Sequence, residues 1–155
     1  MAYPIPEFSV YRELKDIPDF PQWASSYYEH GDLSSRDFTQ FEQIRGDASK
    51  KKPTTDTIPA EELLSITDLG PVSKYEAAFV ESKHFLNLYN KQVTKALLDP
   101  QIREEWGGHQ ISWVYGEATI WPVHYAAWKL EEKVKASEIN FKIIPDANHF
   151  VCRFI

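Results

Sequence analysis

The chain has 155 residues, of which 43% are hydrophobic and 14% aromatic, and its formal net charge is −6. This length and composition predict one globular domain with a sizeable core, and they exclude a disordered chain. The acidic balance excludes a general nucleic-acid binder, because such proteins need a basic face to neutralise phosphates.

A cytoplasmic location is expected. Cys152 is the single cysteine, so no intramolecular disulfide can form, and a reducing compartment is the simplest interpretation. The first residues, MAYPIPEFSVYRELKD, lack the basic segment and apolar core of a signal peptide. No apolar run approaches the roughly 20 residues of a membrane span, so no membrane association is expected.

Residues 1–18 are expected to be extended. Residues 19–108 are expected to form a region of several helices joined by loops. Asp19 is placed to cap the first helix, Pro21 suits its first turn, and Gly31 is expected to end it. The apolar side of this helix carries an aromatic set: Phe20, Trp23, Tyr27 and Tyr28.

A second helix is predicted from Ser34 or Ser35 to Gly46. Its apolar stripe consists of Phe38, Phe41 and Ile44. Residues 47–57 are polar and contain a proline, which favours a mobile loop. The three lysines at positions 50–52 are expected to be solvated there and not to form a phosphate site.

Further helical segments are predicted over residues 57–68, residues 73–98 and, as one short turn, residues 102–106. The segment 73–98 is the longest periodic one. Its apolar residues are expected to be buried, namely Phe79, Phe85, Leu86, Tyr89 and Val93. Replacing Phe85 with alanine is therefore expected to cost about 3–5 kcal/mol.

The C-terminal region, residues 109–155, is predicted to contain a βαβ unit. Residues 111–115 are β-branched and aromatic and are closed by Gly116, which indicates a buried strand. Residues 121–135 have the apolar spacing of an amphipathic helix, and residues 139–144 form the second strand. An intervening helix makes the two strands parallel. His149 then lies in the turn after the second strand, where α/β sheets place their sites.

This order of elements resembles the C-terminal end of an α/β-hydrolase, preceded by a helical cap. Two turns carry the resemblance: Gly116-Glu117-Ala118-Thr119 after the first strand, and Pro145-Asp146-Ala147-Asn148-His149-Phe150 after the second. The resemblance implies an α/β fold with an incomplete sheet. It also implies hydrolysis of an ester, an epoxide or a similar small apolar substrate.

The same resemblance implies roles for residues in the two turns. His149 would be the general base of a triad, taking the proton of a nucleophile through one ring nitrogen while an acid orients the other. The family places an Asp three residues after the glycine of the first turn, where this chain has Thr119. Glu117 is the nearest carboxylate and is therefore the candidate acid.

Other parts of a hydrolase site do not occur in the sequence. There is no G-x-S-x-G nucleophile elbow and no HG-type oxyanion loop. The chain is therefore expected to hold the cap and the C-terminal part of the fold, to be truncated, and to be inactive alone. Two parallel strands leave unpaired edges, which favours self-association or a partner that supplies the missing strands.

Two alternatives to an enzyme stay open, a non-catalytic ligand-binding or protein-interaction module derived from a hydrolase cap, and a truncated product without a settled function. The aromatic residues of the cap-like region either line a substrate entrance or form its own core.

No metal and no cofactor is predicted. His109 and His124 with Glu117 match no metal-binding spacing such as HExxH, and the chain has no G-x-G phosphate loop. Cys152 is too close in sequence to His149 for a nucleophile pair and is expected to be a small buried apolar residue.

Overall fold

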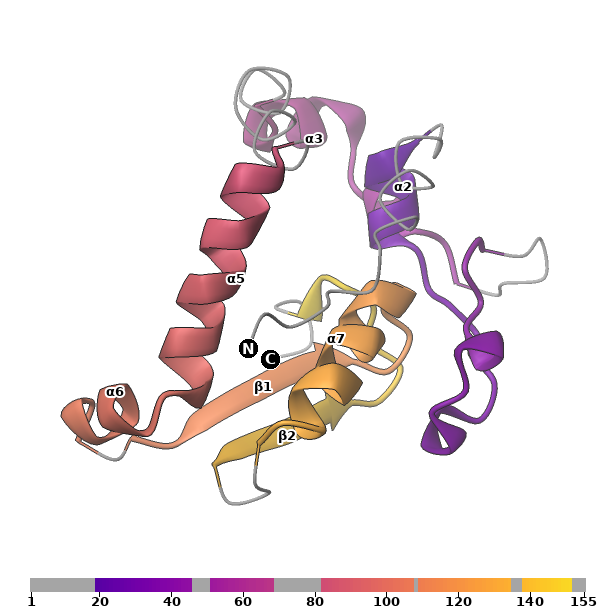
Figure 1. The fold of residues 1–155 in the computed structure, drawn as a ribbon. Coiled ribbons are helices and arrows are strands. Elements are labelled where there is room, and N and C mark those ends of the chain that lie inside the picture. Colours follow the sequence, from indigo (N-terminus) through magenta and orange to yellow (C-terminus); the bar gives the residue numbers. More distant parts are fainter. Residues whose placement is uncertain (1–18, 46–50, 69–81, 108, 135–137, 152–155) are drawn as a thin grey trace. The chain divides into compact units, whose positions relative to one another are not determined.

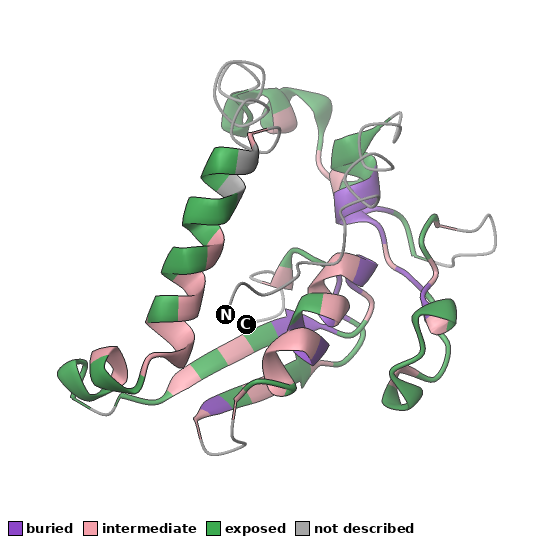
Figure 2. Ribbon diagram, viewed as in Figure 1, coloured by how far each residue is buried: buried purple, intermediate pink, exposed green. Residues whose placement is uncertain are grey.

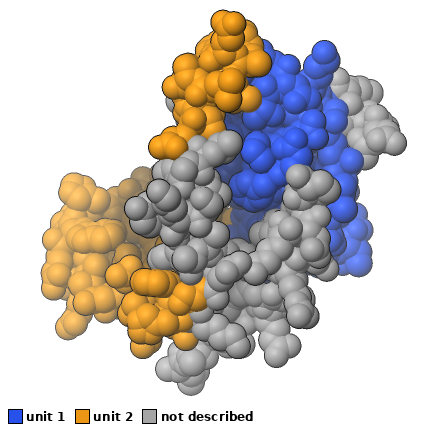
Figure 3. Space-filling model, turned by 90° about the horizontal axis from the view of Figure 1, so that it is seen from above, with its two compact units in different colours: residues 1–58, 114–126, 143–155 blue, residues 59–113, 127–142 orange. Residues whose placement is uncertain are grey.

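The computed structural model describes residues 19–45, 51–68, 82–107, 109–134 and 138–151 (Figure 1). The chain groups into two compact units, which Figure 3 distinguishes by colour. One unit comprises residues 1–58, 114–126 and 143–155, and the other comprises residues 59–113 and 127–142. The segment expected to be extended, residues 1–18, lies outside the described residues, and the expected boundary at residue 108 stays a prediction.

The predicted order of strand, helix and strand is confirmed, although the first strand is only partly buried and the helix ends at Glu131, before the predicted residue 135. Ile111–Gly116 forms β1, Trp121–Glu131 forms α7, and Ile139–Ile144 forms β2. In the described part of the chain, β1 and β2 pair in parallel as a sheet of two strands (Figure 1). The protein is thus α/β in the general sense of helices combined with a small parallel sheet. Parallel pairing brings the carboxyl ends of both strands to the same edge.

The first helix, α2, is shorter than predicted. It spans Phe20–Ser25 and begins as expected, with the Asp19 carboxylate accepting a hydrogen bond from the backbone N–H of Gln22 at 3.0 Å. It ends well before Gly31, because Ser26 takes an extended backbone conformation. The hydroxyl of Ser26 donates instead to the Gln22 carbonyl at 2.7 Å, so a side chain takes up a carbonyl at the end of the helix.

The second helix predicted for this region is wrong. Leu33–Ser35 and Phe38–Gln40 form two separate 3₁₀ turns, η1 and η2. Asp32 and Asp37 each cap one of these turns through the side chain. Arg36, between the turns, has a left-handed backbone with φ of 54°, which a continuous helix cannot contain.

The described part of the predicted loop 47–57 is packed and not fully solvated. Thr54–Thr57 forms the 3₁₀ helix η3, and Thr54 is buried. The hydroxyls of Ser25 and Thr55 lie 2.8 Å apart, which ties η3 to the end of α2.

The core of the first unit is aromatic. Its largest buried members are Trp23, Tyr28, Phe41, Tyr115 and Trp121. The buried Tyr28 hydroxyl donates to the Trp23 carbonyl at 2.9 Å, so its polar end is satisfied. Trp23, Tyr28 and Phe41 are thus core residues, but Phe41 packs against Trp121 and His124, so this core is shared with the C-terminal region and is not the cap-like region's own.

The second unit contains three described helices, α3 (Ala60–Ile66), α5 (Lys83–Leu98) and α6 (Pro100–Glu105). α3 and α5 lie within predicted helical segments, whereas α6 begins at Pro100, before the short turn predicted over residues 102–106. None of the described helices combines the length and apolar character that a membrane span requires.

The burial predicted for the long helix is wrong at two positions. Phe85 is 45% exposed and Tyr89 is 53% exposed, while Val93 is half-buried. Figure 2 shows that the described side chains of α5 are exposed or intermediate. Phe79 and the side chain of Leu86 lie outside the described residues. A loss of 3–5 kcal/mol from Phe85→Ala is therefore no longer expected, since an exposed ring leaves little cavity behind.

Candidate functional site

Two turns meet at the carboxyl edge of the sheet. Residues 117–119 follow β1, and residues 145–149 follow β2. The backbone N–H of Glu117 donates to the Ile144 carbonyl at 2.9 Å, and that of Ala118 donates to the Ala147 carbonyl at 2.8 Å. The strand pairing is thus continued into the turns, and the two turns are fixed against each other.

Gly116 permits this close approach. A Cβ atom at this position would collide with the carbonyl oxygens of Ala147 and Asn148. Because those oxygens belong to backbone, they cannot swing aside as the end of a side chain could. Glycine is therefore required by space here, at the point where β1 ends.

Asn148 anchors the turn that carries His149. Its side chain is fully buried, and its Nδ2 group donates to the Ser25 carbonyl at 2.6 Å and to the Thr54 hydroxyl at 2.7 Å. Its Oδ1 atom accepts from the backbone N–H of Phe150 at 3.0 Å. Both N–H groups and the carbonyl oxygen of the side chain form hydrogen bonds, so the orientation of the amide is specified. The bond to Ser25 holds the turn against the C-terminal end of α2.

His149 itself is exposed, and its ring lies beside the side chain of Thr119. Nδ1 of His149 lies 3.4 Å from Oγ1 of Thr119, which is completely buried. The hydroxyl can donate to this nitrogen or accept from it, depending on the tautomer. Partial desolvation of the ring lowers the pKa of His149 below its usual value, which favours the neutral form at pH 7.

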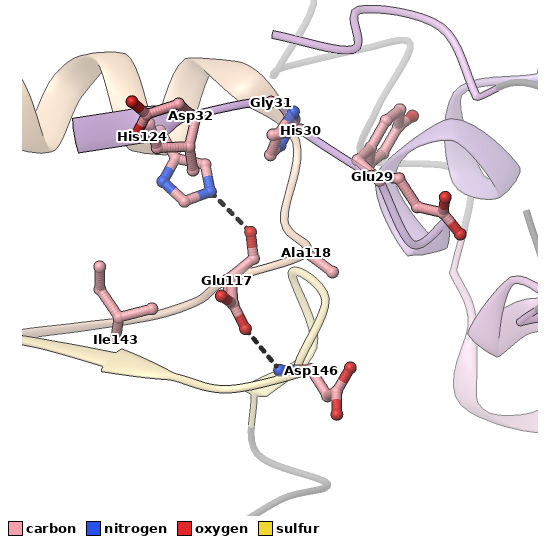
Figure 4. A pocket seen from close by; sticks show the side chains of 11 residues that line it. Glu29, His30, Gly31, Asp32, Glu117, Ala118, His124, Ile143 and Asp146 are labelled. Carbon is pink, nitrogen blue, oxygen red and sulfur yellow. Dashed lines mark hydrogen bonds between the residues drawn. The ribbon is translucent and has the colours of Figure 1, made fainter. Parts of the chain in front are cut away.

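Glu117, the acid expected from the sequence, interacts elsewhere. Its carboxylate accepts a hydrogen bond from the backbone N–H of Asp146 at 3.1 Å (Figure 4). Asp146 has a left-handed backbone, with φ of 58°, and its carboxylate pairs with Lys51 at 3.1 Å. The structure therefore brings Thr119, and not Glu117, to the ring of His149.

Three consecutive carbonyl groups of the turn after β1 each accept a hydrogen bond. Nε2 of His124 lies 2.9 Å from the Glu117 carbonyl, and Nε2 of His30 lies 2.8 Å from the Thr119 carbonyl. The backbone N–H of Tyr28 donates to the carbonyl between them, that of Ala118, at 3.1 Å. The position of Thr119 is thus fixed by its backbone on both sides.

His30 and His124, which bond to the carbonyl groups of Thr119 and Glu117, are both held in the neutral form. Nδ1 of His30 accepts from the backbone N–H of Glu42 at 3.1 Å, so this ring carries its proton on Nε2. Burial lowers the pKa of His30, and burial together with the neighbouring His30 lowers the pKa of His124 to about 4. Both rings therefore act as donors to backbone at neutral pH.

A cavity of about 380 Å³ lies beside the turn after β1 (Figure 4). It is lined by residues 28–33, Glu117, Ala118, His124, Ile143 and Asp146. Neither Thr119 nor His149 lines it, so the cavity and the Thr119–His149 pair are separate features of the same unit.

The residues weighed as metal ligands do not form a metal site. His124 donates to backbone, and no three His, Cys, Asp or Glu side chains of the described residues are grouped as a metal ion would require. Cys152 lies outside the described residues.

Sequence reasoning located the two turns but missed the residues that hold them, namely Tyr28, His30 and Asn148. The sequence does offer one signal for Asn148. It precedes His149 in a predicted turn, and the side chain of an Asn in a turn often forms a hydrogen bond with nearby backbone. Its actual partners, Ser25 and Thr54, are distant in sequence, and no local pattern points to them. The sequence predicts Gly116 to terminate a strand, and in the structure it also permits contact between the two turns.

Comparisons of the chain with protein-family models, with curated proteins and with solved structures found no match.

Proposed function

We propose that this chain is an α/β-hydrolase-related polypeptide that holds a helical cap-like segment and the last two strands of that fold. The reaction class implied is hydrolysis of an ester, an epoxide or a similar small apolar substrate, with His149 as the general base. One observation carries the proposal, the contact between Thr119 and His149. Thr119 occupies the position of the acid in that family, and its side chain faces the histidine as an acid would.

The chemistry available to this pair is limited. A carboxylate beside the imidazole would orient the ring and stabilise the imidazolium that forms when the base takes a proton. The Thr119 hydroxyl can orient the ring by one hydrogen bond, but it carries no charge. The lowered pKa of His149 keeps the ring neutral, which a base requires, and also makes it a weaker base.

The nucleophile is the missing component. The sequence contains no G-x-S-x-G elbow, so a covalent acyl-enzyme cannot form by the route that α/β-hydrolases use. We propose that the wild-type chain alone does not catalyse ester hydrolysis, and that the acyl-enzyme route requires strands and a nucleophile from a partner chain.

The experiment compares hydrolysis of a nitrophenyl ester by the wild type and by three variants. We expect the wild type to be no faster than His149→Ala. Thr119→Asp should be about tenfold faster than the wild type, because an oriented His149 could act as general base towards water, a route that needs no nucleophilic side chain and contributes about 10²–10⁴-fold when fully effective. The double variant Thr119→Asp/His149→Ala should lose that gain.

Thr119→Asn is the matched control, since it offers a similar shape without charge. Equal rates for Thr119→Asp and Thr119→Asn would contradict the proposed role of position 119. Burst kinetics in the wild type would show a nucleophile that the sequence does not reveal, and the proposal of an inactive chain would then be wrong.

A further inference from the structure

The cavity beside the turn after β1 has the size of a small-molecule site. Its volume of about 380 Å³ lies in the range of ligand pockets, roughly 300–1,000 Å³. It belongs wholly to the first compact unit, because every residue that lines it falls within the ranges of that unit. Thr119 and His149 lie outside it, so a ligand here would not depend on the hydrolytic pair.

The charged side chains that line the cavity are all acidic. They are Glu29, Asp32, Glu117 and Asp146, and no Lys or Arg is among the described residues that line it. Asp146 is paired with Lys51, so its charge is partly compensated. The remaining carboxylates give the cavity a negative field, which attracts cations and repels anions.

His124 supplies a second and independent observation. This side chain is 1% exposed and lines the cavity. Its Nε2 must carry the proton, because its partner, the Glu117 carbonyl, can only accept. In the neutral ring the other nitrogen, Nδ1, is therefore an acceptor, and the described residues offer it no donor.

This nitrogen is not among the buried, unpaired side-chain atoms of the described residues, so it is accessible to solvent and can accept a hydrogen bond from water or from a ligand. In Figure 4 this nitrogen points away from the bond to Glu117. A ligand that takes the place of water at this nitrogen must bring an N–H or O–H donor into the cavity. Among carboxylates, a donor that also carries positive charge is favoured over a neutral one.

The acidic side chains are distributed around the cavity and do not converge on one point. No three of the His, Asp and Glu side chains in the described part of the chain are grouped closely enough to hold a metal ion. The occupant that fits is thus larger than a single metal ion and carries its charge on a group with several N–H donors.

We propose that this cavity binds a small organic cation, an alkylammonium or guanidinium compound. One N–H donates to Nδ1 of His124, and the positive charge lies near the carboxylates of Asp32 and Glu117. This site goes beyond the proposed hydrolytic function and does not rest on it.

The test uses the full chain with methylguanidinium as the probe and methylurea as an uncharged probe of similar shape. The ring nitrogens of His124 are followed by long-range ¹H–¹⁵N NMR at pH 7. We expect methylguanidinium to shift the Nδ1 resonance saturably, with a dissociation constant on the order of 1 mM, and methylurea to bind at least about tenfold more weakly.

Variants of the lining carboxylates then test which of them contribute to binding of methylguanidinium. Glu117→Gln and Asp32→Asn should each weaken methylguanidinium about threefold to tenfold, because each removes one favourable charge pair in partly hydrated surroundings. Both substitutions keep an acceptor for the local backbone hydrogen bonds, and circular dichroism checks that the fold is retained. Glu62→Gln, which removes an exposed carboxylate of α3 in the other unit, is the control and should bind as the wild type does.

Three outcomes would overturn the proposal: equal affinity for the two probes, an Nδ1 resonance that does not respond, or the same affinity in all three variants. His149→Ala should leave methylguanidinium binding unchanged. Failure of this site and failure of the proposed hydrolytic pair are therefore separately observable.

Discussion

The hydroxyl of Thr119 and Nδ1 of His149 lie 3.4 Å apart, although 30 positions in sequence and a whole helix separate them. Each residue follows one of two parallel strands, and parallel pairing brings the two strand ends together. The strand pairing therefore brings a buried hydroxyl and an imidazole together at the carboxyl edge of the sheet.

We predict that Thr119→Asp raises the pKa of His149 by about one unit or more. A carboxylate within hydrogen-bonding distance favours the imidazolium and opposes the desolvation that lowers this pKa in the wild type. The measurement is an NMR titration of the His149 ring protons between pH 4 and 9. Thr119→Asn is the control, and the same pKa in both variants would show that position 119 does not face the ring in solution.

We predict that Asn148→Ala destabilises the protein by about 2–4 kcal/mol. The change removes two donated hydrogen bonds and one accepted one, and it leaves the Ser25 carbonyl without this donor. A buried group left unsatisfied costs about 1–3 kcal/mol. Urea denaturation measures the free energy of unfolding.

The control for that experiment is Asn140→Ala, which changes an exposed asparagine of β2. An exposed substitution is expected to alter the free energy of unfolding by no more than about 0.5 kcal/mol. Equal losses from the two variants would mean that Asn148 is not the anchor of the turn.

We predict that Phe41→Ala and Phe85→Ala differ strongly in effect. Phe41 is only 6% exposed and contacts Phe38, His30, Trp121 and His124, so its removal should cost about 3–5 kcal/mol. Phe85 is 45% exposed, and its removal should cost less than about 1 kcal/mol. Thermal melts of both variants decide the matter, and a larger loss at Phe85 would show that α5 is covered in solution.

We predict that stability falls as the pH is lowered from 6.5 to 4. Burial gives His124 a folded pKa of about 4, whereas the unfolded chain takes up this proton near pH 6.5. The unfolded state therefore binds more protons in this window, and stability rises with pH. At about 1.36 kcal/mol per unit, the loss attributable to His124 is roughly 3 kcal/mol at pH 4.

His30, whose pKa is also lowered by burial, adds to this loss in the same direction. The control is His124→Gln, because an amide can still donate to the Glu117 carbonyl but does not titrate. Urea denaturation at several pH values should give this variant a shallower dependence on pH. An unchanged slope would assign the acid loss to other groups.

The elements that sequence reasoning predicted well are those specified by local pattern. β1, α7 and β2 show alternation, helical periodicity and a terminating glycine within short windows, and they were confirmed. The helix predicted for the region after α2 is wrong, because the spacing of Phe38 and Phe41 suits both a helix and a pair of short turns. Asp32 and Asp37 decide between these by capping the turns, and their side chains compete with a continuous helix.

Burial and the contacts of the site were predicted less well, because both depend on partners that a local window does not contain. The apolar spacing of α5 predicts which residues share one face, but not whether another element covers that face. The location of His149 followed from the order of the strands. The approach of Thr119 to it depends on how the two turns are clamped, and the clamping groups come from residues near position 30 and from Asn148.

These clamping contacts span most of the chain. Asn148 bonds to Ser25 across 123 positions and to Thr54 across 94, and His30 bonds to Thr119 across 89. The βαβ unit, in contrast, closes over a short stretch. Closing a long loop costs more chain entropy than closing a short one, and contacts between distant residues slow folding. The strands and α7 are therefore expected to form first, with the two turns still able to separate. Only when the segment around α2 and η3 docks does the amide of Asn148 find its acceptors, so the final placement of His149 is a late event in folding.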